Sequence, residues 1–348
     1  MNPILTILSV AYPFAPVGLD AAGGTEQILA LIDRGLTADG HRSIVIAAEG
    51  SSVTGELIAI PASPEAVEDS HERWREAIRE TLERVPVDLV HMQGLDFHSY
   101  LPPPGPPVLI TLHLPPSFYP DSIFRLERPH TWMHCVSSSQ LRACPPSRLM
   151  MPIIENGVPL DLLDPPPPAR RDYALAIGRI CPEKGLHLAV EAAERAGIPL
   201  HIAGKLFPYP EHEQYWKEVL APMIQPPHRF LGPLGISEKP GVMAGARCLL
   251  VPSLVAETSS LVAMEAIACG TPVVAFASGA LAEVVEDGRS GFVVNDTAHM
   301  AEAIRAVDSL DRGALRDIAC ARFSGRRMVA DYFARYNAVL SLVKGTNL

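Results

Sequence analysis

The sequence predicts an α/β protein of two Rossmann-like halves, each a parallel sheet with helices on both faces. Short apolar runs alternate with amphipathic segments along the chain, a pattern typical of such sheets. Four consecutive prolines, 165–168, interrupt this alternation and form a stiff spacer without backbone donors. With 348 residues, of which 48 % are hydrophobic, the chain has room for about two domains with large cores.

Before the prolines, the first half begins with an apolar strand that precedes an amphipathic helix. Ile28, Leu29, Ile32 and Leu36 recur at helical spacing in that helix, and Trp74 lies on the apolar face of a second, charged helix. The predicted strands are 4–10, 43–47, 87–92, 108–113 and 133–136, and the predicted helices are 25–37 and 64–84.

After the prolines the same alternation restarts, which predicts a second sheet. The predicted strands are 174–177, 200–203, 229–231, 248–251, 272–276 and 292–294, and the predicted helices are 185–195, 211–220, 261–269, 301–307, 311–322 and 325–343. Because ligands of parallel sheets bind at the carboxyl ends of the strands, residues that directly follow strands are the candidates for chemistry.

The net charge of −10 is concentrated in the first half of the chain. Residues 1–165 hold 10 arginines, no lysine and 20 acids, whereas residues 166–348 hold 19 basic and 19 acidic residues. This distribution disfavours nucleic acid as a partner and makes the first half a poor surface for an anionic bilayer.

The six cysteines show no C-x-x-C spacing and no histidine pairing typical of zinc sites, so reduced thiols and no metal are expected. The N-terminal segment has no basic region before its apolar run and reaches Pro13 early, which indicates a strand and not a signal peptide. No run of 18 apolar residues occurs. These features predict a cytoplasmic protein without a transmembrane segment.

The strongest motif is ETSSLVAMEAIACGTPVVA at residues 257–275, with Glu257 in a loop and Glu265 within the helix that follows. Free N–H groups at the start of that helix, near Ser259, Ser260 and Leu261, are suited to a diphosphate. Glu265 could accept hydrogen bonds from ribose hydroxyls, and Glu257 would then face a sugar. Judged by the two glutamates alone, an ordinary loop acid and an ordinary helix acid are the favoured interpretation.

The context of these glutamates resembles the C-terminal signature of family 4 glycosyltransferases. The resemblance includes CGTPV at 269–273, EVVEDG at 283–288 and GFVV at 291–294, and extends to AGGTEQ at 22–27, NGVPLD at 156–161 and AIGRICPEKG at 176–185. It implies a GT-B fold, in which two Rossmann-like domains face each other across a cleft. It also implies a retaining hexosyltransferase that needs no metal or cofactor and uses a nucleoside-diphosphate sugar, most readily of UDP or GDP.

The resemblance assigns an acceptor-binding domain to residues 1–164 and a donor-binding domain to residues 165–330. Residues 331–348 are then a helix that packs back towards the first domain. An acidic, lysine-free acceptor domain favours a neutral or cationic soluble acceptor. The oligomeric state is left open.

The segments that carry the resemblance contain cations and glycines next to strand ends. Arg179 and Lys184 follow one strand and could neutralise a diphosphate leaving group. Lys205 is equally well interpreted as a third such cation or as a surface lysine. Gly23 and Gly24 permit close approach of a ligand to the backbone, but a tight turn without a ligand explains them as well.

His113 ends a predicted strand and matches the cleft histidine of the family, although a lone histidine is more often structural. The resemblance therefore assigns catalytic roles to His113 and Glu257. Since no D-x-D pair occurs in the chain, cations and helix N-termini would have to replace a diphosphate-bound metal.

Two departures from the family pattern leave the donor base and sugar open. The chain has Thr258 to Ser260 where a glycine or an aromatic residue is common, and Lys205 to Pro208 where a glycine turn is common. A nucleotide-sugar epimerase of the same architecture is an alternative, as is a non-catalytic nucleotide-sugar-binding partner of a larger assembly.

Overall fold

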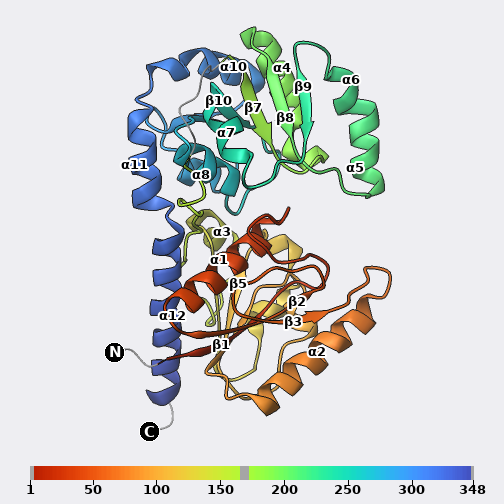
Figure 1. The fold of residues 1–348 in the computed structure, drawn as a ribbon, viewed down its shortest axis with the longest axis vertical. Coiled ribbons are helices and arrows are strands. Elements are labelled where there is room, and N and C mark those ends of the chain that lie inside the picture. The colour runs from red at the N-terminus through yellow and green to blue at the C-terminus, as the bar shows by residue number, and fades with distance from the viewer. Residues whose placement is uncertain (1–3, 165–171, 346–348) are drawn as a thin grey trace. The chain divides into compact units, whose positions relative to one another are not determined.

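The computed structural model describes residues 4–164 and 172–345 (Figure 1). The proline run at 165–168 lies outside the described residues. Contacts divide the chain into two compact units: the first runs to Asn156 and resumes at Gly325, and the second is Gly157–Ser324. The division therefore falls eight residues before the expected boundary at 164, and the first unit also takes the whole C-terminal helix.

The first unit is an alternation of strands and helices closed by the C-terminal helix. In chain order its elements are β1 (Thr6–Val10), α1 (Gly24–Ala38), β2 (Arg42–Ala48), β3 (Glu56–Ile60), α2 (Val67–Arg84), β4 (Leu89–Met92), β5 (Val108–Leu112), β6 (Thr131–Cys135), α3 (Ser138–Ala143) and α12 (Gly325–Gly345), with short 3₁₀ turns at Phe97–Ser99, Pro116–Phe118 and Asp121–Arg125.

The second unit repeats the alternation with shorter strands. Its elements are β7 (Ala174–Ile177), a 3₁₀ turn (Pro182–Lys184), α4 (Leu186–Ala196), β8 (Leu200–Ala203), α5 (Pro210–Tyr215), a π turn (Trp216–Leu220), α6 (Ala221–Met223), β9 (Arg229–Gly232), α7 (Lys239–Ala244), β10 (Cys248–Val251), α8 (Leu261–Ala268), β11 (Val273–Phe276), α9 (Leu281–Val284), β12 (Gly291–Val294), α10 (Thr297–Ala306), a 3₁₀ turn (Val307–Ser309) and α11 (Gly313–Arg322).

The two sheets are parallel throughout and share one topology. Their strand orders are β3-β2-β1-β4-β5-β6 and β12-β11-β10-β7-β8-β9. Both correspond to the Rossmann order 3-2-1-4-5-6, in which the winding direction reverses between the first and fourth strands. The reversal lies between β1 and β4 in the first unit and between β7 and β10 in the second, and ligands of such sheets bind at the carboxyl ends of these strands.

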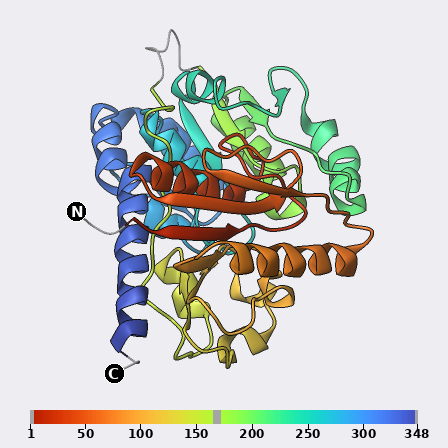
Figure 2. The same ribbon diagram turned by 60° about the horizontal axis from the view of Figure 1, so that its bottom comes forward.

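Alternation along the strands separates the two faces of the first sheet. Leu8 and Val10 of β1 pack with Trp74 and Ile78 of α2 on one face. On the other face Val45 packs with Leu29 of α1. Helix α12 lies beside α1, as Figures 1 and 2 show. The C-terminal helix thus completes one layer of the first unit.

The second sheet is divided in the same way. Ala174 and Leu250 face a core that includes Val190 of α4 and Ile304 of α10. The intervening strand residues face α8 and α11, where Leu315 and Ile267 are fully buried. Both faces of the sheet are covered by helices. This explains why the sequences of the strands are continuous apolar runs.

The α/β fold class and the parallel sheets predicted from the sequence are confirmed, with a few elements missed. Strand β3 is an edge strand with little burial, so its residues carry no strong apolar pattern. Helix α7 contains Pro240 and Gly241, which concealed it, and α9 is only four residues long. The helix expected over 211–220 is divided between α5 and the π turn that follows it.

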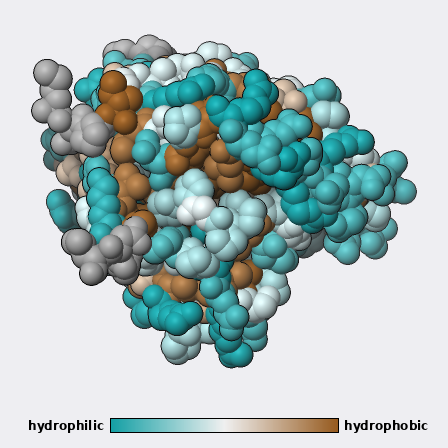
Figure 3. Space-filling view, turned by 90° about the horizontal axis from the view of Figure 1, so that it is seen from below, coloured by the Kyte–Doolittle hydropathy of each residue, from teal (hydrophilic) through white to brown (hydrophobic). Residues whose placement is uncertain are grey.

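In Figure 3 hydrophobic residues of the molecule lie in separate patches between hydrophilic ones. Phe118 and Ile4 are among its exposed large apolar side chains. Scattered exposure of this kind is common on folded proteins. Among the described residues, no helix combines the length and the apolar character needed to cross a bilayer.

Candidate functional site

The candidate site lies in the second unit, where two loops leave the carboxyl ends of β7 and β10. The first loop runs from Gly178 to Gly185 and the second from Pro252 to Ser260. These are the two strands between which the winding reverses. The topology alone therefore brings the two motif segments together, although about 70 residues of sequence separate them.

An ion pair joins the loops. Nζ of Lys184 donates to Oε1 of Glu257 at 2.6 Å, and the side chains are 25 % and 13 % exposed. Oγ of the buried Ser253 donates to the same carboxylate oxygen at 2.7 Å. Both charged groups are positioned by protein partners and still reachable by a ligand.

Two glycines, one in the first loop and one after β11, allow close approach to the loop of Glu257. A Cβ on Gly185, which has a φ of 60°, would lie 2.1 Å from the carbonyl oxygen of Pro252. A Cβ on Gly279, with a φ of 58°, would lie 2.3 Å from the carbonyl oxygen of Glu257. The N–H of Leu254 also donates to the carbonyl of Glu183 at 2.8 Å. Any larger residue at either glycine would displace the segment that holds Glu257.

A second ion pair is buried beneath helix α8. Nζ of Lys239 donates to both carboxylate oxygens of Glu265, at 3.0 and 3.1 Å. Glu265 is 1 % exposed and Lys239 is 8 % exposed. Burial raises the pKa of Glu265, and the ammonium group of Lys239 opposes that rise. Unlike Glu257, Glu265 is closed off from solvent as it stands.

Helix α8 begins directly after Ser260, and no side chain caps it. Leu261 is its first residue, so the first N–H groups of the helix lie close to Ser259 and Ser260. Oγ of Ser259 is buried and has no hydrogen-bond partner among the described residues. The binding of an anion at this terminus stays a prediction.

The other two predicted cations differ from Lys184. Arg179 directly follows the turn residue Gly178, is exposed, and forms no ion pair with a described residue. Lys205 is also exposed, and its ammonium group lies 5.0 Å from the centre of the Phe207 ring. The lysine that pairs with the second glutamate is Lys239 instead, which the sequence interpretation did not select.

His113 belongs to the first unit and directly follows β5. It is 8 % exposed, its Nε2 lies 3.2 Å from Oε1 of Gln93, and its backbone N–H donates to the hydroxyl of Tyr119. Burial lowers the pKa of His113 to about 3, so the ring is neutral at ordinary pH. Its proposed catalytic role stays a prediction.

Gly23 and Gly24 lie at the start of α1, also in the first unit. A Cβ on Gly23 would lie 1.9 Å from a carboxylate oxygen of Glu26. Glu26 is itself buried at the helix N-terminus. The space that Gly23 leaves is thus occupied by this carboxylate, and a ligand at the turn is not needed to explain the glycine.

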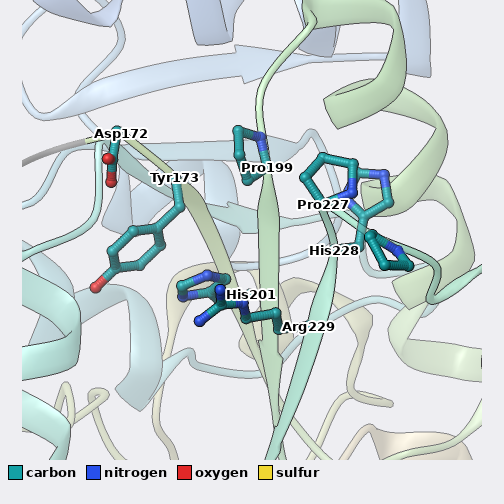
Figure 4. A pocket seen from close by; sticks show the side chains of 8 residues that line it. Asp172, Tyr173, Pro199, His201, Pro227, His228 and Arg229 are labelled. Atoms are coloured by element: carbon teal, nitrogen blue, oxygen red, sulfur yellow. The ribbon is translucent and has the colours of Figure 1, made fainter.

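A half-open cavity of about 440 Å³ lies at the opposite, amino edge of the second sheet (Figure 4). It is lined by Tyr173, His201 and Arg229, among others. The rings of Tyr173 and His201 stack with their centres 4.0 Å apart. None of the predicted donor-site residues lines this cavity.

Sequence reasoning missed Lys239 and Ser253, the two side chains that hold the motif glutamates. Ser253 is the second residue after β10. A search for polar side chains at strand ends would have found it. Lys239 lies at the start of a helix that the pattern did not predict. It is one of only five lysines in the chain, and that scarcity was the signal available.

The two Rossmann-like units have the fold found in GT-B glycosyltransferases. Residues 171–308 match the family described as Glycosyl transferases group 1. This stretch of the second unit is similar to that family, and the predicted resemblance to glycosyltransferases is confirmed. Assignment to family 4 stays a prediction.

Similar proteins of known name agree with this class. The chain is 35 % identical over 213 residues to D-inositol 3-phosphate glycosyltransferase of Geodermatophilus obscurus, which covers 53 % of this chain and 47 % of the relative. It is 32 % identical over 194 residues to glycogen synthase of Mycobacterium tuberculosis, covering 52 % of this chain and 44 % of the relative. The chain thus spans about half the length of the curated relatives it matches.

Solved structures resemble the fold over nearly the whole chain. Sucrose-phosphate synthase of Thermosynechococcus elongatus matches with a TM-score of 0.78 at 20 % identity, covering 97 % of this chain and 100 % of the other. Anabaena HepE in complex with UDP-glucose matches with a TM-score of 0.73 at 18 % identity, covering 95 % and 100 %. At these identities the likeness establishes the fold and nothing further.

Proposed function

We propose that this chain is a retaining glycosyltransferase that moves a sugar from a nucleoside-diphosphate sugar to an acceptor. We expect a hexose as the sugar and, by the family resemblance, UDP or GDP as the nucleotide. The proposal includes membership of family 4. A crystal structure of HepE holds UDP-glucose, and this supports a donor of the same chemical class for the fold.

The observation that carries the proposal is the Lys184–Glu257 pair at the strand ends where the winding reverses. A cation and a carboxylate lie 2.6 Å apart there, beside the N-terminus of α8, and both stay partly exposed. A diphosphate needs positive charge and N–H donors, whereas sugar hydroxyls need an anionic acceptor. The arrangement supplies these two kinds of partner side by side.

In the proposed reaction the bond between the anomeric carbon and the diphosphate breaks, and its electron pair leaves with the phosphate. Lys184, Arg179 and the N–H groups near Ser260 and Leu261 stabilise the negative charge that develops there. Glu257 accepts hydrogen bonds from the sugar as oxocarbenium character develops. The acceptor oxygen bonds to the same face, and its proton passes to the departing phosphate.

Glu265 is the proposed partner of the ribose. Each of its carboxylate oxygens accepts one hydrogen bond from Lys239 and keeps a second lone pair for a hydroxyl. Because Glu265 is 1 % exposed, binding requires that neighbouring residues move aside. Lys239 then acts as a positioning residue for Glu265.

We assign the acceptor to the first unit, with His113 as the proposed catalytic group there. The first half of the chain holds no lysine and carries the whole net charge, which favours a neutral or cationic acceptor. No cofactor and no metal are proposed for the transfer. The chain has no D-x-D pair, and Lys184 and Arg179 take the role that a diphosphate-bound metal would have.

A thermal-shift panel tests the donor directly. UDP, GDP, ADP and TDP, with and without their sugars, are added to the full chain, and a nucleotide that binds the native state must raise Tm. We expect one nucleotide to do so in the wild type. No response to any of them would overturn the proposal.

Turnover of the donor found in that panel tests the site residues. Lys184→Ala and Glu257→Ala should each lower kcat by about 10²–10³-fold, as removal of one group that stabilises transition-state charge does. The matched control is Lys217→Ala, an exposed lysine of the same unit, which should retain wild-type kcat. Product analysis separates the alternatives, because an epimerase converts its nucleotide sugar without acceptor and a non-catalytic partner binds without turnover.

A further inference from the structure

Three side chains that could ligate a metal meet in the second unit, outside the proposed donor contacts. A thiol, a carboxylate and an imidazole, from Cys181, Glu183 and His212, each place one donor atom within 4.8 Å of the others. Cys181 and Glu183 come from the turn after β7, and His212 comes from α5. At the tetrahedral angle, donor atoms about 2.0–2.3 Å from a zinc ion stand roughly 3.5 Å apart, so small side-chain movements close the site.

The histidine of this cluster lacks a full set of partners. His212 is 8 % exposed, and its Nδ1 is buried without a hydrogen-bond partner among the described residues. A buried, unpaired ring nitrogen is costly, since the desolvation of a polar group is normally offset by a hydrogen bond. A metal ion bound to Nδ1 would remove this cost, because the buried nitrogen would then have a partner.

We propose that Cys181, Glu183 and His212 form a binding site for one Zn(II) ion. Thiolate, imidazole and carboxylate together are a ligand set that zinc accepts, and hard cations such as Mg²⁺ avoid sulfur. Glu183 is exposed while Cys181 and His212 are buried, so a water molecule reaches the fourth position from the side of Glu183.

Zinc binding depends on the protonation of the Cys181 thiol and the Glu183 carboxyl group. Burial raises the pKa of the Cys181 thiol, and a hydrogen bond to Glu183 adds to that rise. Binding therefore releases a proton from sulfur to solvent, and affinity increases with pH. Although burial opposes it, hydrogen bonds from its own backbone N–H and from the Cys181 thiol hold the pKa of Glu183 below its ordinary value.

Zinc at this site would fix the turn that also carries Lys184. The carbonyl of Glu183 accepts the N–H of Leu254 at 2.8 Å, so the turn is already connected to the loop of Glu257. An ion that ties this turn to α5 stabilises the native state in proportion to its binding free energy. The proposal concerns zinc binding itself and is independent of sugar transfer.

The test measures zinc uptake by the full chain after treatment with a chelator, in a phosphine reductant. A chromophoric chelator competes for zinc and reports the number of ions bound and their Kd. We expect one ion per chain in the wild type, and a rise in Tm when it binds. Removal of a side chain that only hydrogen-bonds a metal-coordinating residue weakens metal binding roughly 10–100-fold. Because Cys181→Ser and His212→Gln remove coordinating atoms themselves, each should weaken zinc binding by more than that.

Cobalt(II) supplies a spectroscopic test of the sulfur ligand. The wild type and the matched control Cys320→Ser, at an exposed cysteine of the same unit, should both show a thiolate-to-cobalt charge-transfer band, and Cys181→Ser should not. Glu183→Gln covers the case in which a buried variant fails to fold, because Glu183 is exposed, and it should also weaken binding. Zinc uptake below one ion per chain in the wild type, or unchanged Kd in Cys181→Ser or Glu183→Gln, overturns the proposal.

Discussion

The two units of this chain bury polar side chains in different ways. In the first unit, Nε2 of His91 lies 2.7 Å from Oγ1 of Thr111, which lies 2.9 Å from Nε2 of His134. The hydroxyl of Tyr336 on α12 lies 2.8 Å from Nδ1 of His91, and that of Tyr332 lies 3.3 Å from Thr111. All of these groups are neutral donors and acceptors.

In the second unit, one buried polar cluster is an ion pair. Lys239 and Glu265 are both nearly fully buried and hold each other through two hydrogen bonds. Lys184 and Glu257 form a second, more exposed pair. A neutral network fixes how α12 packs on its sheet, whereas paired charges can exchange their partner for a charged ligand.

Breaking the buried pair should have the largest effect on stability. Lys239→Met leaves the Glu265 carboxylate uncompensated in the core, and we expect the free energy of unfolding to fall by about 3–5 kcal/mol. Denaturant unfolding measures it. The double variant Lys239→Met/Glu265→Leu removes both charges and should recover most of the loss. A double variant as unstable as the single one would contradict the role of the unpaired charge.

The buried histidines of the first unit predict a loss of stability in acid. Burial lowers the pKa of His113 and of His134 to about 3, below the 6.5 of an exposed histidine. The unfolded chain therefore binds more protons below pH 6.5, and the free energy of unfolding falls as the pH falls. Each fully shifted histidine accounts for about 2 kcal/mol between pH 7 and pH 5. His134→Gln should reduce this fall by the contribution of one histidine. Denaturant titrations at the two pH values measure the fall, and an equal fall in the wild type and the variant would contradict the prediction.

An exposed ion pair of the first unit should have the smallest effect. Arg42 and Glu56 form two hydrogen bonds across β2 and β3, at 2.7 and 3.0 Å, with side chains 43 % and 55 % exposed. Glu56→Gln should change the free energy of unfolding by less than about 1 kcal/mol, because water screens such pairs. A change as large as that of Lys239→Met would contradict the prediction, because it would show that burial does not determine the effect of breaking an ion pair.

Much of the fold followed from local patterns. Strands such as β7, β8 and β10 coincide with the predicted ranges, because residues buried on both faces give continuous apolar runs. Strand β3 and helix α7 escaped prediction for the opposite reason: one is barely buried, and the other carries Pro240 and Gly241. The sequence could place Glu257 and Lys184 at strand ends, and the topology then made them neighbours.

The alternation of apolar runs by itself determined two parallel α/β sheets, and the spacing of strand-end residues predicted a candidate ligand site. Only the tertiary structure decided which charges meet, because a pair such as Lys239 with Glu265 depends on how α7 packs against α8. The same holds for Cys181, Glu183 and His212. Their spacing matches no zinc motif, yet the packing of α5 against the turn after β7 brings a thiol, a carboxylate and an imidazole together.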